Sequence, residues 1–360
     1  MSHEERRENE FRDQPDATLT VDGLRVTIPS GSGAVEAVRD VSFDLPPNTT
    51  LGLLGSSGSG KTVTGLAVMG LPPGGRGSIS GGSIRWGGTE LTELPEAGLR
   101  EIRGGEIAMV FQDPGMALTP VHRVGKLLGD TVRAHSGAGR HEIEARTLDL
   151  LREVGLSDPA EVAASYVQEL SGGMKQRVMI AIALAGEPSV LIADEPTSAL
   201  DAIARDQILG LIESIQANRG LAVLMISHDL GVLSRMSDRI VVIEEGRTVE
   251  SADTATLLSH PRHPASAALV ASGRAAASFP ERARAVPEPV RADPVLRVED
   301  SRRPTPTARA RRSGTRRSRS PPGRCSGWSG NPAAERPRSP AASSGRPNPR
   351  VAGSSGRART

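Results

Sequence analysis

Residues 55–62 read Gly55-Ser-Ser-Gly-Ser-Gly-Lys61-Thr62, and this stretch decides the fold. It fits the pattern G-x-x-x-x-G-K-[ST], follows the apolar segment Thr50–Leu54 and precedes an apolar helical segment that starts near Val63. A glycine-rich loop between a strand and a helix lets backbone N–H groups surround the phosphates of a nucleotide. The sequence therefore predicts a phosphate-binding loop; the alternative is a flexible Gly/Ser turn.

Each part of this loop has an expected role. The glycines let the backbone curl around the phosphates, and the helix N-terminus adds its dipole. Lys61 supplies a positive charge to the phosphates, and the Thr62 hydroxyl supplies a ligand to Mg²⁺. The predicted phosphate-binding residues are Gly55, Ser56, Ser57, Gly58, Ser59, Gly60, Lys61 and Thr62.

A second chemical signal is a buried apolar strand that ends in two acids, Ser189-Val-Leu-Ile-Ala-Asp194-Glu195. Ligands of α/β sheets bind at the carboxyl ends of parallel strands, which is where these acids are expected. We expect Asp194 to hold Mg²⁺ and Glu195 to act as the general base on the attacking water. A carboxylate that caps the following helix is the alternative.

The segment Leu170-Ser-Gly-Gly-Met-Lys-Gln-Arg177 contains a third signal. Ser171, Gly172 and Gly173 open a helix, and the free N–H groups of that first turn form a second anion site. One nucleotide needs only one phosphate loop, so a second anion site suggests two chains that share nucleotide. This segment resembles the signature motif of ATP-binding cassette (ABC) proteins. The loop at 55–62 lies before it and the acids at 194–195 lie after it, which is the order in that family.

The resemblance assigns roles to further residues. Gln112, in Val-Phe-Gln-Asp-Pro, resembles the glutamine that contacts Mg²⁺ and water and couples to a transmembrane partner. Asp201, in Ser-Ala-Leu-Asp, resembles an aspartate that faces the partner's nucleotide, and His228, in Ser-His-Asp, resembles the histidine that contacts the γ-phosphate. Ile28 stands where the family has an adenine-stacking aromatic residue, so it offers only apolar contact and weaker nucleotide binding.

The pattern along the chain predicts an α/β fold. Continuous apolar runs at Ile107–Phe111, Val190–Ala193, Ala222–Ile226 and Ile240–Ile243, with Thr50–Leu54, indicate a buried parallel sheet. Leu19–Val26 and Ser78–Trp86 alternate and predict an added antiparallel sheet, while 121–185 has helical periodicity. Together with the resemblance, this predicts a P-loop NTPase (RecA-like) core, an antiparallel β-subdomain and an α-helical subdomain that carries the signature.

Composition divides the chain into segments. Residues 301–360 contain fifteen arginines, no lysine and one acid, a net charge of +14; the first 300 residues keep 29 basic and 41 acidic residues, a net charge of −12. We expect a solvated, disordered leader at 1–16, one cassette domain at 17–272, and a low-complexity, disordered tail of Arg, Pro, Ser, Ala and Gly at 273–360.

Several classes of protein are excluded or disfavoured. The single cysteine, Cys325, excludes an internal disulfide framework and a multi-cysteine metal site, which fits a reducing cytoplasm. The charged first sixteen residues contain no apolar core of a secretory signal. The longest apolar runs fall well short of the roughly 20 residues that span a bilayer, so membrane association is expected through a partner.

Phrases such as 111–120, 191–201 and 261–269 resemble the ATPases of dipeptide, oligopeptide and nickel importers. The resemblance implies an ATP- and Mg²⁺-dependent ATPase that energises uptake of peptides or a related small solute, at the cytoplasmic face of the membrane. The implied partners are transmembrane permease subunits, a second ATPase subunit (identical or a paralogue) and, indirectly, a solute-binding protein. The alternative is a soluble cassette ATPase that acts on nucleic acid or ribosomes, or that binds nucleic acid through its basic tail.

The tail carries a further hypothesis, a second cassette in a shifted reading frame. Val295-Leu-Arg-Val-Glu-Asp300 resembles Thr18-Leu-Thr-Val-Asp-Gly23, after which the composition changes abruptly. With the frame moved back by one base, the codons of 325–337 can encode Leu-Leu-Gly-Leu-Val-Gly-Glu-Ser-Gly-Ser-Gly-Lys-Thr, which repeats most of 50–62. The rival interpretation is a genuine basic tail that binds nucleic acid or an anionic membrane surface.

Overall fold

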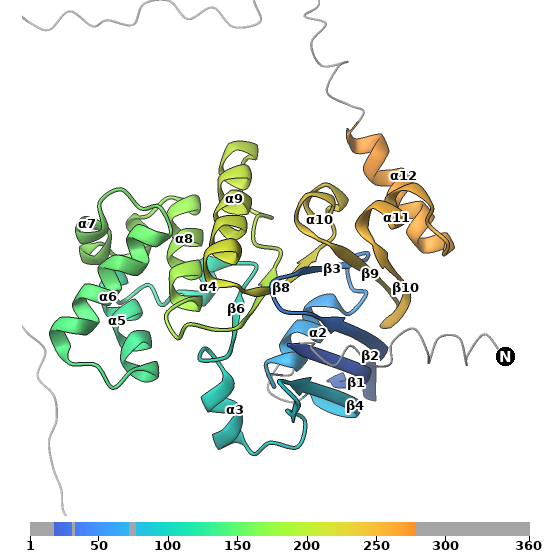
Figure 1. Ribbon diagram of the computed structural model, residues 1–360, viewed down its shortest axis with the longest axis horizontal. Helices are drawn as coiled ribbons and strands as arrows, with labels where there is room; N and C mark the ends of the chain where they lie inside the picture. Colours follow the sequence, from blue (N-terminus) through green and yellow to red (C-terminus); the bar gives the residue numbers. More distant parts are fainter. Residues whose placement is uncertain (1–17, 31–32, 72–76, 278–360) are drawn as a thin grey trace, which may run out of the picture. The chain divides into compact units, whose positions relative to one another are not determined.

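The computed structural model describes residues 18–30, 33–71 and 77–277 (Figure 1). The predicted leader at 1–16 and the shifted-frame segment at 325–337 lie outside these residues. Of the predicted tail, only 273–277 is described, and it forms the end of a helix, α12, Pro264–Ala277. This helix continues five residues past the expected boundary because its last turn is rich in alanine, the strongest helix former.

The strands of the described residues join in one ten-stranded sheet in the order β5-β4-β1-β2-β10-β9-β3-β8-β7-β6. Their bounds are β1 Leu19–Ser30, β2 Gly33–Leu45, β3 Thr50–Leu54, β4 Ser78–Trp86, β5 Thr89–Glu90, β6 Ile107–Val110, β7 Val190–Asp194, β8 Ala222–Ser227, β9 Arg239–Glu244 and β10 Arg247–Asp253.

The parallel part of the sheet forms the centre of the fold and confirms the predicted P-loop core. Strands β9, β3, β8, β7 and β6 run parallel, and every residue of β3, β6, β7 and β8 is buried. Alternate residues serve two cores: Leu53 packs with the antiparallel sheet, and Leu54 packs with the helices of the opposite face. Strands covered on both faces are apolar throughout, which explains their continuous runs.

The antiparallel subdomain is built from β1, β2, β4 and β5. Strand β1 pairs antiparallel with both β2 and β4, as its alternating pattern predicts. The sequence analysis missed β2, although its second half alternates buried Val41, Phe43 and Leu45 with more exposed residues. One parallel bridge, Arg247–Asp40, links β10 to β2 and joins this subdomain to the central sheet.

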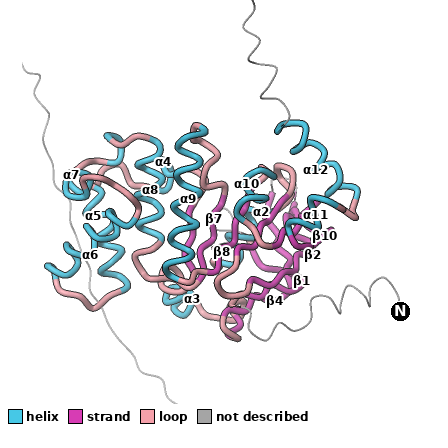
Figure 2. Tube along the Cα trace, turned by 45° about the horizontal axis from the view of Figure 1, so that its top comes forward, coloured by secondary structure: helices cyan, strands magenta, loops and turns pink. Residues whose placement is uncertain are grey.

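The helices that surround the sheet are α2 Lys61–Val68, α3 Glu96–Ile102, α4 Pro114–Ala117, α5 Val124–His135, α6 Arg140–Glu153, α7 Pro159–Ala164, α8 Gly172–Ala183, α9 Ala202–Arg219, α10 Leu230–Met236 and α11 Thr254–Ser259, besides α12 and a 3-10 turn at Val167–Glu169. Helices α5 to α8 occupy the region predicted as the helical subdomain. They gather beside β7 and β8, on the side away from β1, β2 and β4 (Figure 2).

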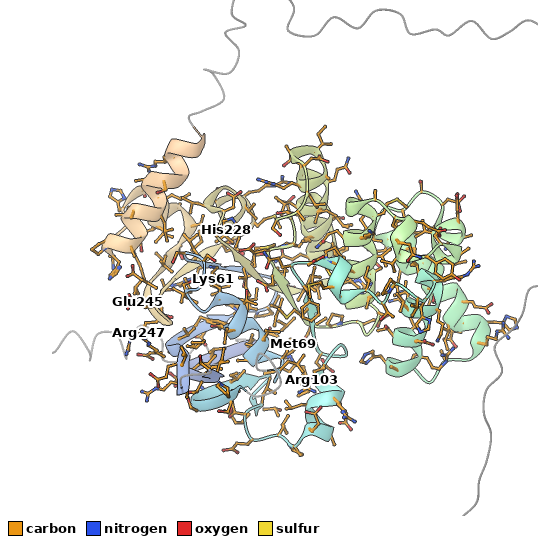
Figure 3. The ribbon with its side chains drawn as sticks, turned by 180° about the vertical axis from the view of Figure 1, so that it is seen from behind. Lys61, Met69, Arg103, His228, Glu245 and Arg247 are labelled. Atoms are coloured by element: carbon orange, nitrogen blue, oxygen red, sulfur yellow. The ribbon has the colours of Figure 1, made fainter. Side chains whose placement is uncertain are left out.

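Helix α2 packs against the central sheet, and hydrogen bonds from Arg103 hold its C-terminal end. Arg103 donates from Nε to the Met69 carbonyl at 2.7 Å and from Nη2 to the Gly70 carbonyl at 2.9 Å (Figure 3). These bonds satisfy carbonyls that the end of a helix leaves free. Among the described residues, no helix is long and apolar enough to cross a membrane.

Candidate active site

The loop at 55–60 connects the end of β3 to the start of α2 and is packed tightly against its neighbours. A Cβ added to Gly55 would lie 2.3 Å from the carbonyl oxygen of Ile243 in β9. Gly60 has φ of 103°, and a Cβ there would lie 2.7 Å from the carbonyl oxygen of Ala37 in β2. These two positions therefore accept only glycine, and the loop is held against two strands far apart in sequence.

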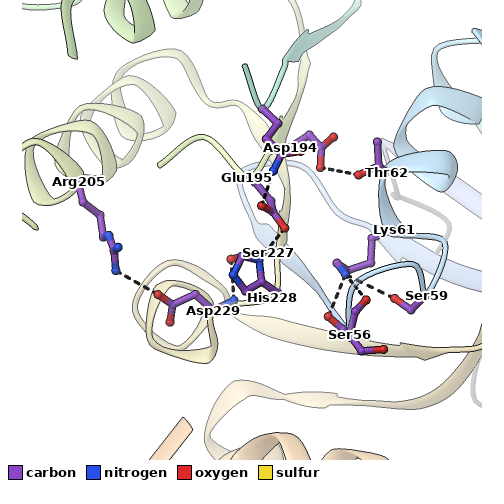
Figure 4. A network of polar contacts seen from close by, with 12 residues as sticks. Ser56, Ser59, Lys61, Thr62, Asp194, Glu195, Arg205, Ser227, His228 and Asp229 are labelled. Carbon is purple, nitrogen blue, oxygen red and sulfur yellow. Dashed lines mark hydrogen bonds and ion pairs between the residues drawn. The ribbon is translucent and has the colours of Figure 1, made fainter. Parts of the chain in front are cut away.

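Lys61 begins α2 and points its ammonium group back into the loop. Its Nζ donates to the carbonyl oxygens of Gly55 at 2.9 Å and Ser56 at 2.8 Å (Figure 4). Burial lowers the pKa of Lys61, and the nearby carboxylates of Glu195 and Asp194 oppose this shift. The structure thus places a buried positive charge at the loop, where the phosphates are expected.

Asp194 is the last residue of β7 and is only 2% exposed. Its Oδ1 accepts a hydrogen bond from Thr62 Oγ1 at 3.1 Å, which joins the two residues predicted to hold Mg²⁺ (Figure 4). Burial raises the pKa of Asp194 to about 6; the Thr62 hydrogen bond and Lys61 lower it, while Glu195 raises it. A bound cation would offset this burial cost.

Glu195 follows at once and adopts a left-handed backbone conformation with φ of 45°. Such a conformation is uncommon for a residue other than glycine, and it persists where surrounding contacts require it. The Glu195 N–H donates to the carbonyl oxygen of Ile226 in β8 at 2.9 Å. This bond turns the chain at the end of β7 and leaves the side chain at the carboxyl edge of the sheet.

The carboxylate of Glu195 gathers two other predicted site residues. Gln112 donates from Nε2 to Glu195 Oε2 at 2.9 Å, and His228 Nδ1 lies 2.7 Å from Glu195 Oε1. The Glu195 side chain is 15% exposed and that of His228 is 60% exposed, so the imidazole lies on the open side of the site. Three side chains from separate strand ends therefore meet at one carboxylate.

The structure brings together only part of the predicted Mg²⁺ site. Thr62 and Asp194 are hydrogen-bonded to each other, whereas Gln112, the third predicted ligand, is bonded to Glu195. The described residues contain no group of three or more His, Cys, Asp or Glu side chains able to hold a metal.

The start of α8 is a different kind of site. Ser171 caps the helix, accepting a hydrogen bond on Oγ from the Met174 N–H at 3.3 Å, and both Ser171 and Gly172 are exposed. A Cβ on Gly172 would meet only a Leu200 methyl group at 3.7 Å, and one on Gly173 only the Ala204 methyl group at 3.9 Å. The chain's own packing does not require glycine here, so these residues leave room for an external group.

Asp201 lies close to this helix start and caps α9. Its Oδ1 accepts from the N–H groups of Ile203 at 3.0 Å and Ala204 at 2.9 Å. Asp201 and Ile203 are exposed. The structure therefore groups exposed Ser171, Gly172 and Asp201 with half-buried Gly173, and the hydrogen bonds of these residues in the described chain stay within their own helices.

Ile28 lies near the end of β1, directly across from Val35 of β2. Val35 is 53% exposed, and Ala37, two residues further along the same strand, touches the loop at Gly60. Residues directly opposite each other on paired antiparallel strands have side chains on the same face, so Ile28 and Val35 form an apolar pair on this hairpin. The sequence analysis missed Val35, because it had not recognised β2.

Comparison with known proteins agrees with this geometry. A family model described as ABC transporter matches residues 38–198. A Brucella abortus protein named for peptide import as an ATP-binding protein is 44% identical over 246 residues, 68% of this chain and 74% of its own length. An Escherichia coli ATP-binding protein named for D,D-dipeptide transport is 42% identical over 246 residues, which cover 68% of this chain and 75% of that protein.

Solved structures share the fold. A dimeric ATP-binding cassette in a post-hydrolysis state, bound to ADP and phosphate, has a TM-score of 0.59 and 25% identity, covering 66% of this chain and 98% of its own. A cassette of a cbiONQ transporter complex from Clostridium perfringens has a TM-score of 0.58 at 25% identity, covering 68% and 92%. With the loop, the strand-end acids and the exposed helix start in place, the chain belongs to the ABC transporter family as an ATP-binding, ATP-hydrolysing subunit.

Proposed function

We propose that this chain works as half of a pair of cassettes that clasp two ATP molecules. In each site the phosphate loop of one cassette faces Ser171, Gly172, Gly173 and Asp201 of the other. The partner is a second copy or a paralogue. This arrangement is supported by the exposed, sterically open start of α8 and by the dimeric cassette that shares the fold.

The observation that carries the mechanism is the meeting of Gln112 and His228 at the Glu195 carboxylate. Glu195 accepts a proton from the attacking water, and its two neighbours hold that carboxylate in place. Lys61 and the loop N–H groups bind the phosphates, while Ile28 and Val35 contact the adenine. Thr62, Asp194 and Gln112 are suited to hold Mg²⁺, which supplies charge neutralisation to the phosphates when bound.

A membrane partner has a suitable docking surface next to Gln112. Phe111, Met116 and Val121 are exposed apolar side chains on and around α4, and Met116 is 88% and Val121 70% exposed. Large apolar side chains grouped on a surface mark sites of protein contact. Docking of transmembrane permease subunits here would reach the active site through Gln112 and hold the chain at the cytoplasmic face of the membrane.

The transported solute is proposed from the relatives, whose names refer to peptide import and dipeptide transport. The cassette would energise uptake of peptides or a related small solute, nickel included, delivered to the permease by a solute-binding protein. If the cassette acted on nucleic acid or ribosomes instead, DNA or ribosomes would stimulate ATP hydrolysis. No surface of the described residues favours that alternative over permease docking.

Reconstitution tests this function. The chain and candidate permease subunits are reconstituted in proteoliposomes with ATP enclosed in the lumen, and uptake of a labelled dipeptide, a labelled tripeptide and nickel, each added outside with the solute-binding protein, is measured. We expect ATP-dependent uptake that Glu195→Gln abolishes and Met116→Asp weakens. Uptake of none of the three, together with hydrolysis stimulated by DNA or ribosomes, would contradict the importer.

A further inference from the structure

Asp229, the residue directly after His228, anchors the short turn that carries this histidine. Its backbone N–H donates to Ser227 Oγ at 3.0 Å, and its Oδ1 caps α10 by accepting from the Gly231 N–H at 2.8 Å. The other carboxylate oxygen, Oδ2, accepts from Arg205 Nη1 of α9 at 3.1 Å (Figure 4). One side chain thus ties the histidine turn to two helices.

The Arg205–Asp229 pair is poorly suited to a purely stabilising role. Both side chains are 39% exposed, and a half-exposed ion pair contributes little to folding stability. The Arg205 Nε is nevertheless buried with no hydrogen-bond acceptor in the described part of the chain. An unsatisfied buried N–H costs more than such a pair returns. A role in positioning Asp229 therefore explains this ion pair better than a contribution to folding stability does.

Arg205 also lies one helical turn from the surface proposed to face the second cassette. Its backbone N–H donates to the Asp201 carbonyl oxygen at 2.8 Å, the first intrahelical bond of α9. Asp201 is exposed, and Ile203 between the two residues is 73% exposed. A partner that contacts this first turn is therefore connected to Asp229 through one turn of helix and the Arg205 side chain.

We propose that Arg205 is a positioning residue that couples the first turn of α9 to the orientation of His228. When the second cassette contacts Asp201 and Ile203, Arg205 holds Asp229, and the histidine turn keeps its imidazole against the Glu195 carboxylate. The proposal rests on the proposed dimer and deepens it, because it names the side chain that links the partner's surface to the reacting site. In this proposal Arg205 and Asp229 act through the histidine turn and not by contact with the nucleotide.

The test compares Arg205 with a matched arginine. Arg235 of α10 also bridges α9 and α10, through Glu213 at 3.0 Å and Asp206 at 3.3 Å, but in the described chain its side-chain hydrogen bonds go to α9 and not to residues 227–229. We expect Arg205→Gln and Asp229→Asn each to lower kcat about threefold, the scale set by a half-exposed ion pair. KM and the ATP affinity of the monomer should stay unchanged. Arg235→Gln should leave kcat unchanged, and asparagine at 229 keeps the helix cap.

Two further variants complete the test. The double variant Arg205→Gln/Asp229→Asn should be no slower than either single variant, because both remove the same interaction. Arg205→Lys should recover part of the lost rate and also serves if Arg205→Gln folds poorly. Equal effects of Arg205→Gln and Arg235→Gln, or additive effects at 205 and 229, would refute the positioning role. If Glu195→Gln still hydrolyses ATP at the parental rate, the general-base role assigned to Glu195 in the proposed function fails instead.

A second inference joins the structure of the phosphate loop to the composition of residues 301–360. The loop segment is constrained at identifiable positions: Leu51, Leu53 and Leu54 are buried, and Gly55 and Gly60 admit no Cβ. Ahead of them, Asn48 has φ of 58°, a conformation that favours glycine or asparagine. Any second phosphate loop of the same build must repeat these residue types at these spacings.

The shifted frame of the tail meets these constraints. Rebuilding each codon over residues 325–337 from the third base of one codon and the first two of the next permits leucine, leucine and valine at the buried positions, and glycine at both restricted positions. Continued upstream over 322–324, the same shift permits Pro-Gly-Thr opposite Pro47-Asn48-Thr49, which puts glycine at the left-handed position. We infer that the gene encodes a second cassette in this frame, with its own phosphate loop and nucleotide site.

A relative leaves room for such a module. The peptidoglycan transport ATP-binding protein of Agrobacterium fabrum is 40% identical over 245 residues, and these make up only 45% of that protein. Sequencing the gene decides the question at Glu335 and Arg336. In the shifted frame the lysine requires GAA for Glu335 and AGA or AGG for Arg336, and the threonine that follows it requires AGA. These codons, with the loop intact around them, are the expected result. A CGN codon at 336 allows only threonine or alanine there and overturns the inference.

Discussion

Two glycine-rich segments in this chain lie at helix starts: Gly55–Gly60 immediately before α2, and Ser171–Gly173, the cap and first two residues of α8. The first is packed against β9 and β2, and its lysine bonds to the loop's own carbonyl oxygens. The second is exposed, and its glycines have room for a methyl group. The first turn is thus filled by contacts within its own chain, whereas open space surrounds the second, as the proposed contact with a partner cassette requires.

This difference shows which effects should appear in a single chain and which only in a pair. Changes at the first turn act on folding and on nucleotide binding by the monomer. Changes at the second should leave both intact and act on the association of two cassettes.

Glu195→Gln should lower turnover by about 10²–10⁴-fold, the usual contribution of a general base. ATP still binds, so the variant should accumulate as an ATP-bound dimer, visible by size-exclusion chromatography beside a phosphate-release assay. Lys61→Ala, in contrast, should lose ATP binding and form no dimer, because it removes the buried charge at the phosphate loop. A Glu195→Gln chain that turns over at nearly the parental rate would show that another group accepts the proton.

Ser171→Arg should abolish hydrolysis and nucleotide-dependent dimerisation while leaving monomer ATP affinity nearly unchanged, since the new side chain fills the open surface at the start of α8. Asn218→Arg, which adds the same charge at the exposed far end of α9, is the matched control and should behave like the parent. Affinity comes from titration of the monomer with ATP. A comparable loss of monomer affinity would mean that Ser171 belongs to its own chain's site.

Gly55→Ala and Gly172→Ala test the packing difference directly. The first forces a methyl group to within 2.3 Å of a backbone carbonyl oxygen and should cost about 1–3 kcal/mol of unfolding free energy, the range for overpacking. The second meets only ordinary contacts and replaces glycine by a better helix former, so monomer stability should hold or rise slightly. Urea unfolding measures both. Equal destabilisation would remove the distinction between the two turns.

Ile28→Tyr should tighten ATP binding up to about tenfold, because an aromatic ring can stack on the adenine beside Val35. Thr27→Tyr is the control, since neighbouring strand residues point to opposite faces of the sheet. Calorimetric titration of the monomer distinguishes them. A gain at 27 as large as at 28 would argue against adenine contact at this hairpin.

The smallest expected effect is the pH dependence of stability at Asp194. Burial raises its pKa to about 6 in the folded chain, above the value of 3.8 for an exposed aspartate, so the folded state binds the proton more tightly. Its contribution to stability is therefore greatest below pH 4 and is lost as the pH rises through about 6. The melting temperature of Asp194→Asn minus that of the parent, without nucleotide, should increase over this range. A constant difference would show that Asp194 ionises normally.

The sequence analysis predicted most of the fold. Strands β3 and β4 have the predicted bounds, and β7, β8 and β9 differ only at their ends, since continuous burial leaves a continuous apolar run. Strand β2 was missed because its first half, Gly33–Ala37, is largely exposed and carries no clear alternation. The pair of Arg205 with Asp229 was also missed, because two charged residues on different elements give no local pattern.

The sequence by itself determined the phosphate loop, the strand that enters it and the acids at the end of β7. Each of these is a contiguous stretch whose chemistry depends on neighbouring residues, so the order of the chain already specifies it. Only the tertiary structure decided that Gln112 and His228, 83 and 33 positions from Glu195, meet at its carboxylate. It also decided that the start of α8 stays open while the loop before α2 is closely packed. Those contacts depend on which strands become neighbours in the sheet, and strand order is a property of the whole fold.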